Sequence, residues 1–439
     1  MGWELTLLIF IVGILSLLLL GMPVALGFLT INLIGTYIFM GGTLGLSQMA
    51  IPIMSSIKSW SFLPIPLFIL LGELLFRSGI AGRAINVTDI FFGRMPGRLG
   101  IVGVVSACLM GSFTGSSMAT TSVLLSTLLP EMENRGYKTP MSLGPIIGAG
   151  GLAMMIPPST LAVLLATLAR ASIGQLLMAG FIPGLLMGSL YLSYIIIRSW
   201  LQPSLAPAYS IQHMTLSKKL WLVVRDLVPI GLIVFLVSGV IFFGIATPSE
   251  AAATGTVGAI VVIALYKQLT LKTIKMALLR SAKISIMLFT IVMGSVSFSY
   301  VLSFSGVNKS LILWVTSLSV HPIIILFSLQ FILFFMGMFI ETTSIIMITI
   351  PMYMPIIQAL GFNPLWFLVI FMINMEMAES TPPFGVLLFV VKGILPRTPM
   401  KDIMLSAVPF LVCDAIAIAM IMLFPKIALW LPSIMLLSR

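Results

Sequence analysis

Two clusters of glycine and hydroxyl residues and two double prolines are the parts of the sequence best suited to bind an ion. We name the clusters the first tip (111–121) and the second tip (337–344), and the stretches that end in the double prolines the first break (148–160) and the second break (374–383). Proline lacks a backbone N–H, so a double proline frees carbonyl groups in the preceding turn. Inside a membrane, freed carbonyls are tolerated where they line a cavity or bind a ligand. Carbonyls and hydroxyls form an oxygen-rich shell suited to Na⁺, and half-helix N-termini favour an anionic group.

Three acidic residues in these stretches are further functional candidates. Glu341 lies in the second tip, and Glu376 and Glu379 lie in the second break. Ionisable groups deep in a membrane are costly and usually functional. Glu379 could hold a cation or a proton, or it could be a neutral acid that joins two helices by a hydrogen bond. The other acids in apolar segments are expected near span ends or in ion pairs: Glu73, Asp414, and Asp226 beside Arg225.

The composition defines the class of protein in which these elements must work. Of 439 residues, 59% are hydrophobic and 8% are charged, against about 25% charged in soluble domains. Apolar runs of membrane-spanning length recur along the whole chain, which predicts an all-α polytopic membrane protein. The net charge of +11 does not indicate nucleic acid, because the basic residues lie in short loops between apolar runs. No Gly-x-x-x-x-Gly-Lys-Ser/Thr motif is present, so ATP is not expected to be the direct energy source.

The distribution of basic residues predicts the topology. The segments 99–130 and 322–360 contain the two tips, and we interpret each as a re-entrant hairpin between ten membrane spans. This arrangement places most Lys and Arg residues on one side of the membrane, which the positive-inside rule makes the cytoplasmic side. The other side then holds both termini and five basic residues: Lys58, Arg170, Lys309, Lys426 and Arg439.

The two halves of the chain match each other at a nearly constant spacing. Pro157-Pro158 corresponds to Pro382-Pro383, and Thr120-Thr121-Ser122 corresponds to Thr342-Thr343-Ser344. Each half has five spans and one hairpin, so 1–210 and 211–439 are predicted to be inverted-topology repeats, an architecture typical of secondary transporters. The stretch 269–283 is interpreted as a basic amphipathic helix at the membrane surface, while 43–60 could be such a helix or a loop.

Several stretches together resemble the large membrane subunit of tripartite ATP-independent periplasmic (TRAP) transporters. They include GMPVALG at 21–27, PIPLFILLGELLFRSGIAGR at 64–83, GSFTGSSMATTSVLL at 111–125 and NMEMAESTPPFGVLLFVVKGI at 374–394. The resemblance implies a protein of the bacterial cytoplasmic (inner) membrane that imports a carboxylate by Na⁺ symport, with Na⁺ as coupling ion and no cofactor. C4-dicarboxylates, sialic acid, sugar acids and 2-oxo acids are the substrates to expect.

The same resemblance implies an elevator mechanism and two protein partners. The hairpins with 141–169 and 364–391 would form a transport domain that slides against a scaffold of the remaining spans. A periplasmic binding protein would deliver the substrate, and a small four-helix membrane subunit, expected to be a separate chain, would brace the large one. Carried onto this sequence, the Na⁺ or substrate sites would comprise Ser112, Thr114, Gly115, Ser116, Ser117, Pro157, Ser159, Gly337, Glu341, Thr342, Thr343, Ser380, Thr381 and Pro382, together with Glu379 on the argument given above.

Two alternatives remain open from the sequence. One is a stand-alone dicarboxylate transporter of similar two-hairpin design, coupled to Na⁺ or H⁺, which needs no binding protein. The other is a membrane enzyme that uses the buried acids. The sequence contains no recognisable set of nucleophile and base, which favours a transporter over an enzyme.

Overall fold

The computed structural model of this chain describes residues 2–91, 95–209 and 215–435. Over these residues the protein is all helical, as the sequence predicts, and contains no β-strand. The helices of the first half are α1 (Trp3–Leu19), α2 (Val24–Phe39), α3 (Thr43–Lys58), α4 (Pro64–Arg77), α5 (Ile80–Phe91), α6 (Arg98–Thr114), α7 (Ser117–Thr127), α8 (Leu129–Asn134), α9 (Thr139–Gly150), α10 (Leu152–Met155), α11 (Thr160–Leu168) and α12 (Ile173–Leu201). Those of the second half are α13 (Leu216–Leu222), α14 (Val228–Val234), α15 (Val240–Phe242), α16 (Pro248–Leu265), α17 (Leu271–Phe304), α18 (Val307–Ser317), α19 (Pro322–Gly337), α20 (Thr342–Ala359), α21 (Pro364–Glu379), α22 (Val386–Ile394), α23 (Met400–Leu423) and α24 (Lys426–Ser433).

Membrane-spanning length is reached by seven helices of the described chain. They are Trp60–Arg77, Ile173–Leu201, Ser217–Phe242, Pro248–Leu265, Leu271–Phe304, Thr342–Ala359 and Met400–Leu423, and the bent pair around the first break makes an eighth if it counts as one span. The segment Ser217–Phe242 combines α13, α14 and α15 through two π-helical turns. The helices α1, α2 and α19 are apolar but only 16 or 17 residues long. The division into ten spans and two hairpins stays a prediction.

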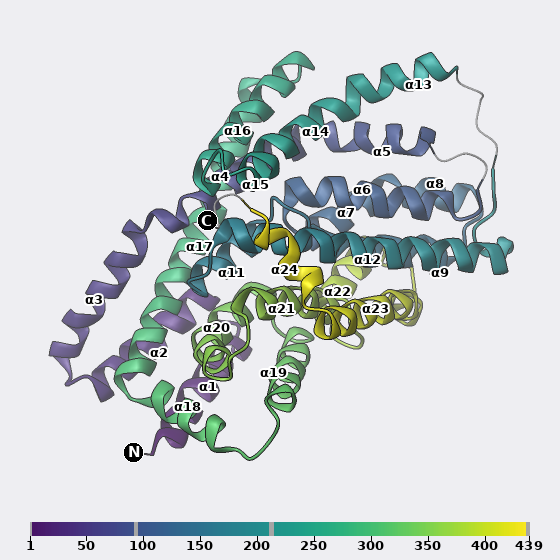
Figure 1. The fold of residues 1–439 in the computed structure, drawn as a ribbon. Helices are drawn as coiled ribbons and strands as arrows, with labels where there is room; N and C mark the ends of the chain where they lie inside the picture. Colours follow the sequence, from purple (N-terminus) through teal and green to yellow (C-terminus); the bar gives the residue numbers. More distant parts are fainter. Residues whose placement is uncertain (1, 92–94, 210–214, 436–439) are drawn as a thin grey trace.

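The helices gather into two groups (Figure 1). In one group α9 packs against α6 and α23, and α12 packs against α23, α21 and α6. In the other group α17 packs against α2, α3 and α4, and α4 also packs against α16. Aromatic edges join the N-terminal helices to α17, because the Phe298 ring meets the rings of Phe10 and Phe28 at 5.7 and 5.5 Å in T-shaped pairs. Such pairs add to the energy of burying the rings.

The structure corrects one predicted helix and settles another. The basic stretch 269–283 is not a separate surface helix, because α17 continues from Leu271 to Phe304 as one helix of 34 residues. Its sequence contains no proline, so nothing stops helical hydrogen bonding from propagating across the boundary that the charges suggested. The stretch 43–60 is a helix over most of its length, α3, and it ends at Lys58 before a short 3₁₀ turn, Trp60–Phe62.

Candidate ion and substrate site

The first tip is a sharp turn between α6 and α7 that lies against the first break. α6 ends at Gly115, whose φ of 55° is in the left-handed region that favours glycine. A Cβ atom at this position would lie only 3.0 Å from the backbone nitrogen of Thr160, the first residue of α11. Ser116 then caps α7 by accepting a hydrogen bond from the backbone N–H of Ala119 at 3.4 Å. The first tip and the first break are therefore in direct contact.

The first break bends its span by 47° between Thr139–Met155 and Thr160–Leu168. Ser159 is buried and caps α11 by accepting a hydrogen bond from the Ala162 N–H at 3.3 Å. The Pro157 carbonyl oxygen accepts a hydrogen bond at 3.4 Å from the hydroxyl of Ser238, in the π-helical turn Phe235–Gly239. The interruption predicted from the double proline is confirmed, and its backbone oxygen has a hydroxyl neighbour on another helix.

The second tip repeats this plan with a carboxylate in the capping position. α19 ends at Gly337, where a Cβ atom would lie 2.5 Å from the Ala378 Cβ, so the end of α19 lies directly on α21. Glu341 caps α20 by accepting a hydrogen bond from the Ser344 N–H at 3.3 Å, and the Thr343 hydroxyl donates to its other oxygen at 2.5 Å. Both oxygens of Glu341 therefore have partners within the second tip.

The second break holds its hydroxyls against the preceding helical turn. The Ser380 hydroxyl donates to the Glu376 carbonyl oxygen at 3.2 Å, and the Thr381 hydroxyl donates to the Met377 carbonyl oxygen at 2.6 Å. The side chain of Glu379 accepts a hydrogen bond from the Thr342 hydroxyl of the second tip. The side chains of Thr342 and Glu379 are both buried. The second tip and the second break, which continues into Pro382, are thus joined as the first tip and first break are.

The sequence marked Glu376 as a functional candidate without assigning it to the ion or substrate sites, and the structure shows that its carboxylate connects the two halves of the chain. Both of its oxygens lie 2.8 Å from the hydroxyl of Ser117, the first residue of α7. A Cβ atom on Gly151 would lie 3.2 Å from Glu376 Oε2, so the carboxylate also lies against the first break. The signal in the sequence was the acid itself, three residues before Glu379. Its partner could not be found there, because Ser117 is 259 residues away.

Near this carboxylate lies a buried oxygen atom with no partner. Thr121 is fully buried, and its Oγ1 has no hydrogen-bond partner in the part of the chain that the structure describes. The same oxygen would lie 2.2 Å from a Cβ atom on Gly150, the neighbour of Gly151. A buried hydroxyl without a partner is unusual in proteins. The first tip thus brings this hydroxyl, and Ser117 with its bond to Glu376, against Gly150 and Gly151 of the first break.

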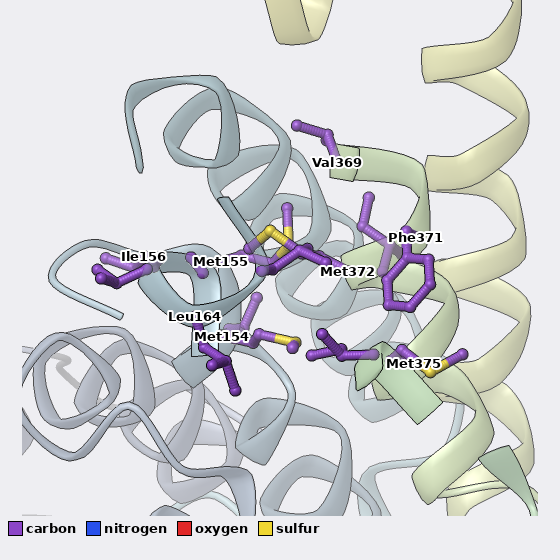
Figure 2. Packing of buried hydrophobic residues seen from close by; sticks show 14 of the residues in the cluster. Met154, Met155, Ile156, Leu164, Val369, Phe371, Met372 and Met375 are labelled. Atoms are coloured by element: carbon purple, nitrogen blue, oxygen red, sulfur yellow. The ribbon is translucent and has the colours of Figure 1, made fainter. Parts of the chain in front are cut away.

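Apolar side chains make up much of the contact between the first break and α21. Figure 2 shows Met154 and Met155 of the first break lying toward Met372 of α21, with Ile156 and Met375 on opposite sides of them. All five side chains are buried. Methionine is unbranched and polarizable and adapts to irregular gaps. These side chains give the oxygen-rich groups an apolar surround, which strengthens their interaction with a charged ligand.

Two other acids have structural partners. Asp226 pairs with Arg225 at 2.6 Å and with Arg83 at 3.8 Å, which confirms its predicted structural role. The position expected for Asp414 was wrong, because the residue lies well inside α23, is buried, and accepts a hydrogen bond from the Tyr191 hydroxyl of α12. The apolar sequence around Asp414 could not reveal which face of α23 packs against α12.

Two predicted site residues, the candidate metal ligands and the cysteines of the chain complete the description of the site. Ser112 and Thr114 lie at the end of α6, and their side chains are outside the described residues. Among the residues that the structure describes, no group of three or more His, Cys, Asp or Glu side chains could hold a metal ion. The two cysteines, Cys108 and Cys413, are not joined in a disulfide.

Apolar helices of spanning length, interrupted at two tips and two breaks that meet in pairs, define a polytopic membrane transporter. The family model of the DctM component of the tripartite ATP-independent periplasmic transporter matches residues 11–427. The chain belongs to this family, and it is the large permease subunit of a TRAP transporter rather than an enzyme. Large permeases of this family are multi-pass proteins of the inner membrane that work with a small membrane subunit and a periplasmic binding subunit.

Two relatives and one solved structure show the range of the similarity. The C4-dicarboxylate TRAP transporter large permease protein DctM of Pseudomonas aeruginosa is 31% identical over 392 residues, 88% of this chain and 89% of that protein. The ectoine TRAP transporter large permease protein TeaC of Halomonas elongata is 29% identical over 427 residues, 96% of this chain and 98% of that protein. The crystal structure of the Alcanivorax borkumensis YdaH transporter aligns with a TM-score of 0.64 at 13% identity, covering 89% of this chain and 90% of that one, so it shares the fold.

Proposed function

We propose that this permease imports a small carboxylate by Na⁺ symport and that the four interrupted elements form its ion and substrate sites. The observation that carries the proposal is the pairing of each tip with a break: Gly115 lies against Thr160, and Thr342 is bound to Glu379. Each pair gathers backbone carbonyls and hydroxyls in a buried place, which suits Na⁺. Glu376 lies on α21, the helix that leads into the second break, and it contacts both the first tip and the first break. Binding of an ion at one tip–break pair would therefore change the surroundings of the other pair.

The substrate class follows from charge and from the relatives. Four helices begin at the tips and breaks, α7, α11, α20 and α22, and helix N-termini carry partial positive charge that favours an anionic group. A C4-dicarboxylate and ectoine, the compounds named for the two relatives, both carry a carboxylate. A carboxylate is therefore the group that we propose this chain recognises.

The remaining parts of the proposal concern movement and partners. The two hairpins with 141–169 and 364–391 would move as a transport domain against the other spans, in an elevator mechanism. Both termini would face the periplasm. A periplasmic binding protein would deliver the substrate, and a small four-helix subunit would brace the large one, as in the family.

Uptake into proteoliposomes tests this proposal. The chain and its small subunit are reconstituted and supplied with a labelled mixture of succinate, pyruvate and N-acetylneuraminate, with and without the binding protein. We expect uptake to require both an inward Na⁺ gradient and the binding protein. Uptake driven equally by an inward K⁺ gradient would refute Na⁺ coupling, and uptake without the binding protein would favour the stand-alone transporter.

Proton coupling is the second candidate, and a specific contact favours it. Glu379 and Glu376 are both buried, lie one turn apart on α21, and each accepts a hydrogen bond from a hydroxyl of a tip. Buried carboxylates in membrane proteins commonly carry protons. In the same proteoliposomes, uptake driven by an inward proton gradient in the absence of Na⁺, and abolished by Glu379→Gln, would support this candidate over Na⁺ symport.

A further inference from the structure

A large cavity with many hydroxyl groups in its lining lies apart from the tips and breaks. Its volume is about 1080 Å³, just above the usual range of about 300–1,000 Å³ for small-molecule sites. Its walls come from α3, the 3₁₀ turn after it, α11, α12, α16 and α17. Hydroxyl side chains make up most of the polar part of the lining, among them Ser59, Ser61, Thr167, Ser249, Ser295 and Ser299.

The cavity lies along helices that begin at the candidate site. The Thr167 hydroxyl of α11 donates to the Ser61 carbonyl oxygen at 3.4 Å, and the Ser295 hydroxyl of α17 donates to the Met347 carbonyl oxygen of α20 at 3.0 Å. α11 starts at the first break and α20 starts at the second tip. From Thr160 to Leu168, the last residue of α11, a rise of about 1.5 Å per residue gives about 12 Å. The cavity is therefore a place distinct from the tips, at the far end of α11.

Arg170 is the charged residue of the cavity that is free to meet a ligand. It is exposed, and it forms no ion pair with any residue of 2–91, 95–209 or 215–435. Glu250 also lines the cavity, but its carboxylate already accepts hydrogen bonds at the start of α16. The Thr247 N–H and hydroxyl both donate to it at 2.8 Å. The lining thus offers one unpaired positive charge among neutral hydroxyl groups.

The backbone at Arg170 is also unusual. Its φ is 52°, in the left-handed region that favours glycine, just after the end of α11. Lys267 has a φ of 57° at the equivalent place after α16, but it is not part of the cavity. In both places the conformation ends the helix, because the next N–H (Ala171 or Gln268) donates to a carbonyl oxygen five residues earlier, at 2.8 and 3.0 Å. The two residues share charge and backbone geometry, so Lys267 is a matched control for Arg170.

We propose that this cavity is a first binding station for the organic anion, in which Arg170 pairs with a carboxylate before the anion reaches the tips. The proposal rests on the proposed import of a carboxylate. Hydroxyls such as those of Ser59, Ser249 and Ser299 can donate hydrogen bonds to the carboxylate oxygens, and the guanidinium can bind them in a bidentate pair. Other lining hydroxyls, such as those of Thr167 and Ser295, already donate within the protein. The distribution of Lys and Arg residues predicts that Arg170 lies on the non-cytoplasmic side of the membrane, and import starts from that side.

Quenching of Trp60, an exposed residue in the lining, tests the proposal without any transport. The chain with its small subunit is placed in phosphatidylcholine nanodiscs at low ionic strength. The difference in fluorescence between this complex and its Trp60→Phe variant isolates the Trp60 signal. Iodide, an anionic quencher, and acrylamide, a neutral one, are then compared with and without succinate, pyruvate or N-acetylneuraminate; 1,4-butanediol is the uncharged control.

We expect at least one of the three carboxylates to reduce iodide quenching of Trp60 at least twofold, and butanediol to have no effect. Arg170→Gly, which suits the backbone and removes the charge, should abolish this protection, whereas Arg170→Lys should retain it in part and Lys267→Gly in full. The proposal is overturned if none of the three carboxylates protects Trp60 from iodide, or if protection survives in Arg170→Gly. It is also overturned if phosphatidylglycerol in the nanodisc gives the same protection by itself and the carboxylates then add no further protection. Because no transport is measured, a failure of Na⁺ symport would leave this result intact.

Discussion

Glu376 of α21 and Ser117 of α7 are joined by a hydrogen bond in which the serine hydroxyl lies 2.8 Å from both carboxylate oxygens. The bond connects the start of the helix after the first tip with the helix that leads into the second break. Because both side chains are buried, the carboxylate is shielded from water and depends on the few groups around it. A cation bound beside it would gain a charge partner from the other half of the chain.

Glu376→Gln should lower the apparent affinity for Na⁺ in uptake assays by at least tenfold, equivalent to about 1.4 kcal/mol. The change keeps the size of the side chain and removes its negative charge. Glu133→Gln, in an exposed position at the end of α8, is the control and should leave the Na⁺ dependence unchanged. Equal Na⁺ affinity in Glu376→Gln and the unaltered protein would show that the carboxylate takes no part in Na⁺ binding.

Thr342→Val and Glu379→Gln should be strongly non-additive. Thr342 donates a hydrogen bond to Glu379 in a buried place. Thr342→Val removes this bond, and Glu379→Gln leaves only a neutral amide oxygen as the acceptor, so both changes weaken the same interaction. We expect a coupling energy of about 1–3 kcal/mol from the free energies of unfolding of the single and double variants in mixed micelles. Additive effects within about 0.5 kcal/mol would mean that the two side chains act independently.

Gly337→Ala should destabilise the protein by about 1–3 kcal/mol, because the added methyl group would lie 2.5 Å from Ala378 Cβ and force α19 away from α21. Gly393→Ala is the control: nothing lies within 4 Å of its Cβ position in α22, and alanine favours a helix over glycine by about 1 kcal/mol. The thermal unfolding midpoint should fall in the first variant and stay or rise in the second. A midpoint unchanged by Gly337→Ala would show that α19 and α21 can separate without cost.

Tyr191→Phe should cost about 1–3 kcal/mol of stability, because it leaves the buried Asp414 side chain without its hydrogen-bond donor. Replacing both partners by apolar residues, Tyr191→Phe with Asp414→Leu, should restore much of this loss. Unfolding in mixed micelles measures both. If the double variant is less stable than Tyr191→Phe alone, Asp414 has a role beyond its bond to Tyr191.

The membrane class and the four interrupted elements could be predicted because they depend on local chemistry. Proline lacks an N–H wherever it stands, so the bend at Pro157 needs no knowledge of neighbours. The contacts that complete the site depend instead on how helices pack. The bond between Ser117 and Glu376 joins residues far apart in sequence, and the burial of Asp414 depends on the face of α23 that meets α12. The continuity of α17 was missed for another reason, since a change from charged to apolar residues does not itself end a helix.

The length of α17 has a mechanical consequence. Its 34 residues extend about 51 Å at 1.5 Å per residue, whereas the hydrocarbon core of a bilayer is about 30 Å thick. Its first turns carry Lys272, Lys275 and Lys283, which can remain among anionic lipid headgroups at a gain of about 1 kcal/mol each, whereas Arg280 pairs with Glu73 at 3.1 Å. A long helix anchored in this way at one end resists displacement across the bilayer. In the proposed elevator mechanism, lipid charge would then decide how firmly the scaffold is anchored while the transport domain moves. Vesicles with few anionic lipids should slow transport without changing which substrate is bound.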